Sequence, residues 1–352
     1  MHQKIIKFFL IFLIIFPTST KASSIVMDID SGRILYENNI HEKKLIASIT
    51  KIMTAIIAIE NNDLNKKITV GKEILSMYGT NIYIEVGEII TIKDLLYGLI
   101  LRSGNDSAIA LATATSKTEE KFVELMNDKA KKIGMKNTIF QNSHGLDDYS
   151  KNYSTAYDMA ILSSYAYKNK IYREIASTKR YTTKTKNKTY LWNNRNKLLN
   201  NYKYCTGGKN GYTPDAGRTL VTTASNNDLN LTIVTLNEPN EYDKHENLYN
   251  DTFEKYKNYT ILDKDKFYID KNFINGTPYI KKSFIYPLKE NEFEKITTKI
   301  FINNQDKKQA GKIKINLGDK EIETITIYNK EQKKESSITE KFLLKIKNLI
   351  TR

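Results

Sequence analysis

The chain has 352 residues, of which 40% are hydrophobic and 27% are charged, and this composition excludes a wholly disordered protein. Its length suits a core domain of roughly 200–250 residues and a smaller second domain. The net charge of +15 is spread along the chain without long blocks of one sign, which favours a generally basic surface over a dedicated nucleic-acid-binding patch.

The first 22 residues have the pattern of a secretory signal peptide. Lys4 and Lys7 precede an unbroken apolar run, Phe8 to Phe16, and small residues follow as far as Ala22. A spanning helix needs about 20 apolar residues, so this run is too short for one, although an uncleaved anchor is the alternative. We expect cleavage after Ala22, which removes three lysines and leaves a charge of +12 (15 − 3). The mature protein should work outside the cytoplasm, at the outer face of the cytoplasmic membrane or in the cell wall.

The next part of the chain predicts a sheet built from both ends of one domain. Two apolar stretches, Ile25 to Ile29 and Ile34 to Tyr36, flank a glycine turn and predict a β-hairpin. Helical spacing then dominates from about Leu45 to Lys170. Strand character returns around Lys209, at Thr219 to Ala224 and at Leu229 to Leu236, and a helix is predicted for Glu241 to Lys257. Two early and three late strands, with helices between them, predict one antiparallel sheet.

The C-terminal third has a different pattern of apolar and polar residues. From about Lys264 to Asn329 the chain has short alternating segments and no long helical pattern, which predicts a small all-β domain. Residues Ile338 to Arg352 place Ile338, Phe342, Leu343, Ile346, Leu349 and Ile350 on one helical face and basic residues on the other. Such a helix can lie in a membrane interface or dock on its own domain. The predicted divisions are therefore a signal peptide (1–22), a main domain (23–257), a β-domain (264–330) and a membrane-anchoring helix (338–352).

Ser48 and Lys51 stand at the head of an apolar stretch, Ile46 to Glu60, whose spacing predicts a helix. Residues three apart share a helix face, so the Ser48 hydroxyl and the Lys51 amine are expected within hydrogen-bond reach. A lysine can be the base for a serine nucleophile only if burial or a neighbouring cation keeps its amine neutral. If Ser48 opens the helix, its own N–H is unpaired and can face a developing oxyanion. Ser48 is the only serine of the chain with a lysine three residues after it.

Two further motifs carry groups that this pair lacks. Ser103-Gly104-Asn105 joins two apolar helical stretches, where a short turn can project both side chains into a cleft. The triplet at Ser225 lies in an expected strand turn, where serine and asparagine occur for turn reasons alone. In Gly207 to Tyr212, glycines flank Lys209, permit close backbone approach and provide a strand edge for an extended peptide. Taken singly, the three motifs are better interpreted as a helix, a turn and a glycine-rich hairpin.

Metal and cofactor chemistry find no support in the sequence. Cys205 is the only cysteine, which excludes an internal disulfide and a cysteine-based metal site. The four histidines show no paired spacing such as His-Glu-x-x-His, so a zinc peptidase is disfavoured. We expect no cofactor and no metal.

In the order Ser-x-x-Lys, Ser-x-Asn and Lys-x-Gly, the three motifs resemble those of penicillin-binding proteins and serine β-lactamases. The surrounding residues are similar to the low-molecular-mass D-alanyl-D-alanine carboxypeptidases, serine peptidases of the β-lactamase-like fold. The similarity lies in Ala47 to Ala55, Leu101 to Ala108, Asn142 to Asp147 with Tyr153 to Asp158, and Lys209 to Leu220. It implies an α/β fold with a DD-peptidase-like antiparallel sheet flanked by a helical subdomain, plus a small all-β C-terminal domain.

The resemblance implies a role for each matching residue. Ser48 would be the acylated nucleophile, Lys51 its base, and Ser103 the relay that passes a proton to the leaving group. Asn105 would hold the substrate amide, and Lys209 would lie behind Ser103 and bias the electrostatics. The implied reaction removes the terminal D-alanine from peptidoglycan stem peptides through an acyl-enzyme that β-lactams would trap. The expected partners are thus that peptide, β-lactam antibiotics and, through the C-terminal helix, a membrane surface, with no nucleic acid.

The third motif departs from the family pattern. The family usually has Lys-Thr-Gly, whereas the middle residue here is Asn210. The threonine hydroxyl normally helps to bind the terminal carboxylate of the substrate, and an asparagine amide can also donate but is longer and planar. Arg218 and Lys203 are candidates to share that role. The substrate-binding candidates are Asn210, Gly211, Tyr212 and Arg218, with the N–H groups of Ser48 and Tyr212 as the implied oxyanion hole.

Three alternative functions remain open at this stage. A serine β-lactamase would need a carboxylate that activates water, and Asp147, Asp148 and Asp158 lie in the right third of the chain, although in a carboxypeptidase context. A catalytically impaired wall-binding protein on the same fold would fit if Asn210 marks lost activity. A D,D-endopeptidase would use the same residues. His144 is interpreted as a structural residue in a turn and not as a catalytic base.

Overall fold

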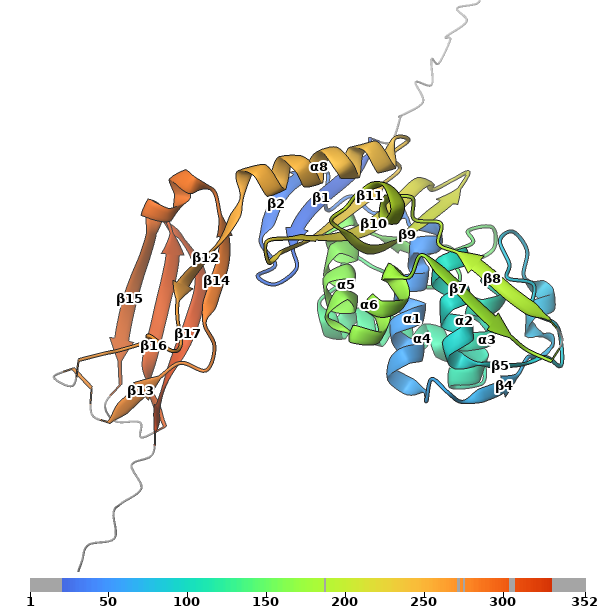
Figure 1. Ribbon diagram of the computed structural model, residues 1–352, viewed down its shortest axis with the longest axis horizontal. Helices are drawn as coiled ribbons and strands as arrows, with labels where there is room; N and C mark the ends of the chain where they lie inside the picture. The colour runs from blue at the N-terminus through green and yellow to red at the C-terminus, as the bar shows by residue number, and fades with distance from the viewer. Residues whose placement is uncertain (1–20, 187, 271–272, 275, 304–307, 331–352) are drawn as a thin grey trace, which may run out of the picture. The chain divides into compact units, whose positions relative to one another are not determined.

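The computed structural model describes residues 21–186, 188–270, 273–274, 276–303 and 308–330. They form two compact units (Figure 1). The first holds the described residues as far as Ser225 together with Leu231–Leu248, and the second holds Asn226–Asn230 and the described residues from Tyr249 onward. The predicted C-terminal helix and nearly all of the predicted signal peptide lie outside the described residues. The predicted domain limits stay a prediction.

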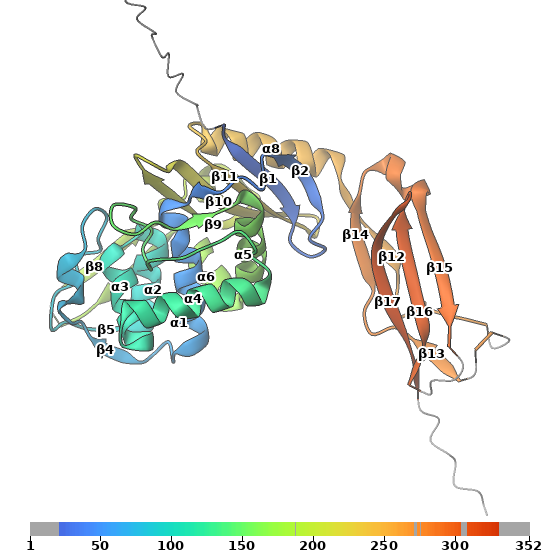
Figure 2. The ribbon, with the colours of Figure 1, turned by 180° about the vertical axis from the view of Figure 1, so that it is seen from behind.

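A five-stranded antiparallel sheet forms the centre of the first unit, in the order β2-β1-β11-β10-β9. The prediction that two early and three late strands share one sheet is confirmed. β1 and β11 are almost wholly buried, because the helices of this unit cover one face of the sheet and the first half of α8 covers the other (Figures 1 and 2). The bounds are β1 Ser23–Asp28, β2 Ile34–Asn38, β9 Cys205–Thr213, β10 Gly217–Asn226, β11 Leu229–Leu236 and α8 Glu241–Lys255.

His245 joins α8 to that sheet. Its two ring nitrogens lie 2.7 Å from Thr222 Oγ1 on β10 and 3.0 Å from Thr235 Oγ1 on β11. Burial lowers the pKa of His245 to about 3, so the ring is neutral at physiological pH and one nitrogen can donate while the other accepts. This buried contact fixes the helix against the two strands.

The helical half of the first unit is built around α1. Every residue of this helix from Lys51 to Ile59 is buried, as expected for a helix with neighbours on all sides. Threonine side chains cap three of the surrounding helices: Thr91 before α2, Thr118 before α4 and Thr155 before α5. The bounds are α1 Lys51–Asn61, α2 Ile92–Tyr97, α3 Asn105–Ser116, α4 Glu119–Ile133, α5 Ala156–Lys168, α6 Lys170–Ser177 and α7 Leu198–Asn201.

A two-stranded hairpin, β7 with β8, was not predicted from the sequence. Its strands, Arg-Tyr-Thr-Thr-Lys and Thr-Tyr-Leu-Trp-Asn, alternate between exposed and more buried positions, and β7 has no apolar run. What holds the hairpin is an aromatic stack, because the Tyr181 ring lies 3.7 Å from that of Tyr97 and within 6.1 Å of Trp192. The remaining short strands pair as β3 with β6 and β4 with β5. The bounds are β3 Lys44–Leu45, β4 Lys67–Thr69, β5 Ile89–Thr91, β6 Tyr153–Ser154, β7 Arg180–Lys184 and β8 Thr189–Asn193.

The second unit is a small all-β structure, as predicted. A four-stranded sheet in the order β13-β17-β16-β15 and a two-stranded sheet of β12 with β14 share a core that includes Ile313, Ile315 and Ile327. The helix predicted for Glu241 to Lys257 ends at Lys255, and β12 follows at Lys257. None of the described residues forms a helix that is long and apolar enough to cross a membrane. The bounds are β12 Lys257–Leu262, β13 Thr277–Tyr279, β14 Phe284–Leu288, β15 Ile296–Ile302, β16 Gln309–Leu317 and β17 Lys320–Lys330.

Candidate active site

The backbone around Ser48 presents this residue at the start of α1. Ala47 to Thr50 form a 3₁₀ turn that runs directly into the helix, and Ala47 has a left-handed φ of 47°. Ser48 is partly exposed, whereas Lys51, one turn further on, is completely buried. The Lys51 Nζ atom lies 3.0 Å from Ser48 Oγ. The i, i+3 spacing in the sequence therefore corresponds to a hydrogen-bond distance in the structure.

Two carbonyl-type oxygens surround the Lys51 amine. Its Nζ donates to Asn105 Oδ1 at 2.7 Å and to the main-chain oxygen of His144 at 2.5 Å. The orientation of the Asn105 amide is set by its own nitrogen, which donates to the Tyr78 carbonyl at 2.7 Å. Both oxygens that face Lys51 can therefore only accept hydrogen bonds.

Burial and two neighbouring cations act on Lys51. Burial is the main cause that lowers its pKa well below the usual value, and the positive charges of Lys209 and Arg195 lower it further, against the opposing effect of Asp106. Lys209 is also buried, and its pKa falls to about 7 through burial and the charge of Arg195. Sequence reasoning anticipated the effect of Lys209 but missed Arg195, which follows the unpredicted β7–β8 hairpin.

Ser103 and Asn105 lie in a tightly held turn between two helical segments. Ser103 adopts a left-handed conformation, with φ 67° and ψ 33°, after the single π-helical turn Gly98–Arg102, and α3 begins at Asn105. The Asn105 N–H donates to the Thr80 carbonyl at 2.8 Å, which ties this turn to the preceding loop. Within the described residues the buried Ser103 hydroxyl has no hydrogen-bond partner, so it is available to a ligand.

Asp106 fixes the other side of the same loop. Its carboxylate accepts hydrogen bonds from the main-chain N–H groups of Ile82, Tyr83 and Ile84, at 2.9, 2.7 and 3.3 Å. Burial nevertheless raises the pKa of Asp106, and these backbone donors oppose that rise. The residue before it, Asn105, is thereby held in place from two directions.

β9 passes directly beside the serine. A Cβ atom at Gly211 would lie 2.7 Å from the Ser48 amide nitrogen and 2.6 Å from Thr219 Oγ1, so only glycine allows this approach. The Lys209 Nζ atom, two residues earlier on the strand, donates to the Asn210 carbonyl at 2.6 Å. The structure thus brings the Lys209-Asn210-Gly211 motif against the Ser48–Lys51 motif.

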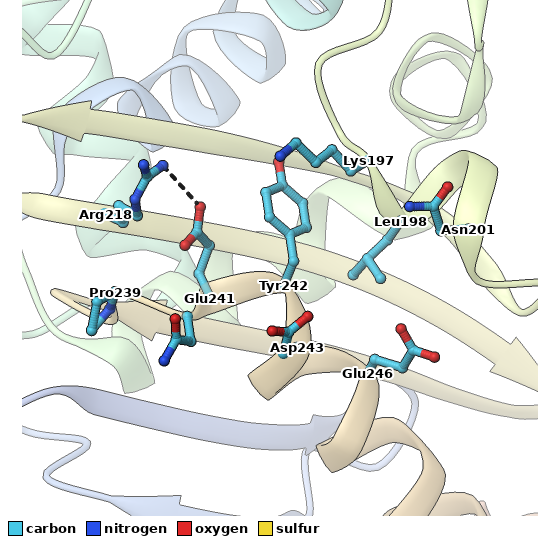
Figure 3. Close-up of a pocket in the computed structure, with 10 residues that line it drawn as sticks. Lys197, Leu198, Asn201, Arg218, Pro239, Glu241, Tyr242, Asp243 and Glu246 are labelled. Carbon is cyan, nitrogen blue, oxygen red and sulfur yellow. Dashed lines mark hydrogen bonds and ion pairs between the residues drawn. The ribbon is translucent and has the colours of Figure 1, made fainter.

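Tyr212 and Arg218 lie further along the same hairpin. They are opposite each other in the β9–β10 register, and the Arg218 guanidinium lies 5.7 Å from the centre of the Tyr212 ring. Arg218 also pairs with the buried Glu241 carboxylate at 3.4 Å. This pair borders a hollow of about 330 Å³ that is lined by Arg218, residues of α7, the start of α8 and the two residues before it. Figure 3 shows the Arg218 and Glu241 side chains pointing toward each other. Among the described residues Arg218 forms no hydrogen bond with Ser48, Lys51 or Lys209. The Lys203 ammonium lies over the Tyr204 ring at 4.6 Å.

The loop that carries His144 supports Lys51 through its main chain. The Ser143 N–H and hydroxyl donate to Glu119 Oε1 at 2.8 and 2.6 Å, and the Ser143 carbonyl accepts from Thr54 Oγ1 at 2.5 Å. The His144 ring accepts a hydrogen bond from the Leu146 N–H at 3.1 Å. Burial is the main cause that lowers the pKa of His144 to about 3, and the charge of Lys51 lowers it further. Sequence reasoning placed His144 in a turn but could not find the carbonyl that faces Lys51, because a main-chain oxygen leaves no residue-type signal.

Metal-ligating side chains do not gather near this site. In the part of the chain that the structure describes, no group of three or more His, Cys, Asp or Glu side chains is arranged to hold a metal ion. The contacts of Ser48 and Lys51 themselves support the chemistry of a serine hydroxyl beside a buried amine of lowered pKa.

Comparison with known proteins also finds relatives that are serine peptidases of the kind that the three motifs resemble. The sequence model of a family described as D-alanyl-D-alanine carboxypeptidase matches residues 16–240. The chain is 37% identical over 208 residues to D-alanyl-D-alanine carboxypeptidase DacF of Bacillus subtilis strain 168, which covers 57% of this chain and 53% of that protein. It is 36% identical over 237 residues to DacC of Escherichia coli strain K12, which covers 62% and 57%. The chain thus spans little more than half the length of these two relatives.

A solved structure resembles this chain over more than the first unit. Penicillin binding protein 5 from Haemophilus influenzae matches with a TM-score of 0.74 and 26% identity, over 87% of this chain and 95% of that one. The predicted DD-peptidase-like fold with a small all-β domain is confirmed. Because the family match extends over more than half of the chain, the chain belongs to the D-alanyl-D-alanine carboxypeptidase family.

Proposed function

We propose that this chain is a serine D-alanyl-D-alanine carboxypeptidase that removes the terminal D-alanine from peptidoglycan stem peptides and is inhibited by β-lactams. The observation that carries the proposal is the completely buried Lys51 amine, 3.0 Å from Ser48 Oγ and 2.7 Å from Asn105 Oδ1. Family membership and the names of the relatives support the same substrate class.

The contacts of Lys51 suit a general base. A neutral amine has two N–H donors and one lone pair, and the two acceptor-only oxygens of Asn105 and His144 use both donors. The lone pair is then left for the third contact, the Ser48 hydroxyl, which donates its proton as its oxygen attacks the substrate carbonyl. The resulting Lys51 ammonium has three N–H donors, one for each of its contacts with Asn105, His144 and Ser48.

The leaving group needs that proton back. The bond between the penultimate D-alanine carbonyl and the terminal D-alanine nitrogen breaks, and that nitrogen must gain a proton to depart as an amine. Ser103, whose hydroxyl is otherwise without a partner in the described residues, would relay the proton from Lys51 to this nitrogen. Water then attacks the Ser48 ester and gives a proton to Lys51. As the bond between the acyl carbon and Ser48 Oγ breaks, Lys51 returns that proton to Oγ, which frees the shortened peptide and restores the enzyme.

Backbone donors beside Ser48 would stabilise the negative charge on the carbonyl oxygen. The Ser48 N–H lies at the start of a helical turn, where the first N–H groups have no partner within the helix. β9 approaches the same nitrogen at Gly211, so the N–H of Tyr212, the next residue, is a natural second donor. We infer an oxyanion hole from these two groups.

Arg195 is a better candidate than Arg218 for the carboxylate of the substrate. Its charge acts on both Lys51 and Lys209, whereas Arg218 is occupied by Glu241 and the Tyr212 ring. One Arg195 nitrogen donates to Thr80 Oγ1 at 3.2 Å, beside the loop that holds Asn105, and this fixes the direction of the side chain. A guanidinium with further donors free suits a carboxylate.

Replacing Arg195 should change the pH dependence of the reaction. Loss of a positive neighbour favours the protonated amine, so the pKa values of Lys51 and Lys209 should both rise in Arg195→Gln. Because Lys51 must be neutral to act, the acid limb of kcat/KM should move to higher pH. The measurement is D-alanine release across pH, with the exposed Arg180→Gln as control. Superimposable acid limbs for wild type and Arg195→Gln would contradict this account of the electrostatics.

The Asn210 departure is testable by restoring the usual residue. Asn210→Thr should leave the rate of D-alanine release equal or higher, since threonine supplies a compact hydroxyl donor at the same strand position. The measurement is kcat/KM on a peptide ending in D-Ala-D-Ala. A large loss would mean that the asparagine amide is specifically used.

The geometry of the site supports the β-lactamase and the inactive wall-binding protein less well than the carboxypeptidase. A β-lactamase needs a carboxylate poised to activate water, but within the described residues no carboxylate oxygen is hydrogen bonded to Ser48 or Lys51, and Asp147 instead accepts from Thr213 Oγ1 at 2.5 Å. A wall-binding protein without activity would not need a buried lysine pair with lowered pKa values. A D,D-endopeptidase would use the same residues, so it is distinguished by assaying a cross-linked peptide.

We further propose that the protein is exported and held at the outer face of the cytoplasmic membrane by residues 338–352. The signal-peptide pattern and the amphipathic spacing of that segment support this location. Deletion of residues 338–352 should move the protein from the membrane fraction to the soluble fraction without changing activity on soluble peptides. Equal membrane retention of the full and shortened chains would contradict the anchor.

The experiment that tests the proposed activity is D-alanine release from a soluble peptide ending in D-Ala-D-Ala by the mature chain. We expect stoichiometric formation of D-alanine and the shortened peptide, and loss of release after incubation with benzylpenicillin. Rapid hydrolysis of penicillin without D-alanine release would instead make the protein a β-lactamase.

A further inference from the structure

The outer face of the four-stranded sheet in the second unit concentrates lysine side chains. In β16, Ile313 and Ile315 are buried against the core, so the alternation of a strand turns Lys312 and Lys314 to the opposite face. Lys299 on β15 pairs directly with Lys314 and therefore shares that face. Lys299, Lys312 and Lys314, together with Lys281, whose position over the Tyr328 ring is described in a later paragraph, are called the lysine face.

The lysines lie close enough to repel one another. Side chains directly opposite on neighbouring strands have Cβ atoms about 4.5–5.5 Å apart, and diagonal ones about 7–8 Å, which describes the Lys299–Lys314 and Lys299–Lys312 pairs. Like charges placed directly opposite destabilise a sheet. Glu321 neutralises Lys314 through a 2.7 Å ion pair, and this bond lowers the pKa of the glutamate. Within the described residues neither Lys299 nor Lys312 forms a direct ion pair, although the charge of Lys312 also acts on Glu321.

Aromatic rings hold two of the ammonium groups on this face. The Lys312 ammonium lies over the Phe301 ring of β15 at 5.6 Å, and the Lys281 ammonium lies over the Tyr328 ring of β17 at 4.0 Å. Tyr328 is on the same face as Lys312, because Thr326 opposite Lys312 and Tyr328 are two residues apart on β17. The Phe301 ring stays 46% exposed beside the Lys312 ammonium. The face is thus cationic, with aromatic rings set among its lysines.

We propose that the lysine face binds a linear polymer that carries regularly spaced phosphate groups. The charges favour such a ligand: four lysines on this face meet a single carboxylate, Glu321, among the described residues that share it, and Lys299 lies directly opposite Lys314 and diagonal to Lys312. Exposed lysines bind one small anion weakly in water, because the interaction of a single pair is largely screened. A chain of anions engages several lysines together and gains from the release of its counterions. This proposal is independent of the proposed peptidase activity.

The test uses the full mature chain and long-chain inorganic polyphosphate as the probe. In the test variant Lys299, Lys312 and Lys314 are each replaced by Gln. In the matched control Lys257, Lys264 and Lys266, exposed lysines of the same unit that lie outside the four-stranded sheet, are replaced by Gln. We expect the test variant to lose at least about tenfold in affinity and its slope of log K against log salt to fall by about 2, with the control near wild type. A triple Lys→Arg variant should keep wild-type affinity, because it keeps the charges.

The possible results separate cleanly. Equal loss in the test and control variants would overturn the proposal, because it would show diffuse attraction to the net positive charge. Equally strong competition by orthophosphate would overturn it in favour of a single-anion site. Binding to vesicles of phosphatidylglycerol and phosphatidylcholine but not to polyphosphate would overturn it in favour of a membrane surface. D-Alanine release, measured on every variant, should stay at the wild-type rate, since none of these lysines belongs to the proposed active site.

Discussion

Ser48→Ala is expected to abolish both D-alanine release and covalent labelling by β-lactams. The substitution removes the hydroxyl that lies 3.0 Å from the Lys51 amine, and alanine cannot form the acyl-enzyme. We expect kcat/KM to fall by at least about 10⁴-fold, because the remaining groups only bind and polarise the substrate. The measurement is D-alanine release at high enzyme concentration, with intact-mass analysis of the variant after exposure to benzylpenicillin.

A matched serine variant provides the control for this result. Ser76 is exposed and its hydroxyl donates only to the Glu73 carbonyl, so Ser76→Ala should release D-alanine at the wild-type rate. Thermal unfolding of both variants checks that the fold is intact. Covalent labelling that persists in Ser48→Ala would show that another residue is the nucleophile and would overturn the assignment.

Lys51→Met is expected to give the second largest loss. Methionine fills a similar volume without an amine, so the Ser48 hydroxyl loses its base while the site stays packed. General-base removal should slow acylation by about 10²–10⁴-fold. The measurement is the rate at which benzylpenicillin labels the protein, followed by mass spectrometry over time.

Lys129→Met is the matched control, since it removes a lysine that is largely buried in α4 and pairs with Glu60 instead of with the site. Its labelling rate should match that of the wild type even if its stability falls. Wild-type labelling by Lys51→Met would mean that a different group takes the Ser48 proton, and Lys209, with a pKa near 7, would be the next candidate to test.

Local spacing explains which parts of the site could be predicted from the sequence. The Ser48–Lys51 pair depends only on helix geometry, and the Ser103 turn depends on two apolar helices that are read directly from their periodicity. The five-stranded sheet was predictable from similarly local patterns, because β1 and β11 are marked by apolar runs and β9 by the glycines around Lys209. Short-range rules decide each of these features.

Long-range and main-chain features could not be predicted in the same way. Arg195 follows a polar hairpin that is held by an aromatic stack, and its influence on Lys51 and Lys209 acts through space. The His144 carbonyl contributes through its backbone, which every residue possesses. Arg218 was assigned to the substrate from its motif, but its contacts with Tyr212 and Glu241 depend on how α8 packs on the sheet. Such contacts are products of tertiary structure.

The measurement that tests the central claim most directly is peptide mapping by mass spectrometry of the mature chain after incubation with benzylpenicillin. The account predicts one stable adduct per chain, located on Ser48, from a protein that also releases D-alanine from a peptide ending in D-Ala-D-Ala. No adduct on Ser48 together with no release of D-alanine would contradict it, and would mean that the buried lysine beside this serine does not activate it.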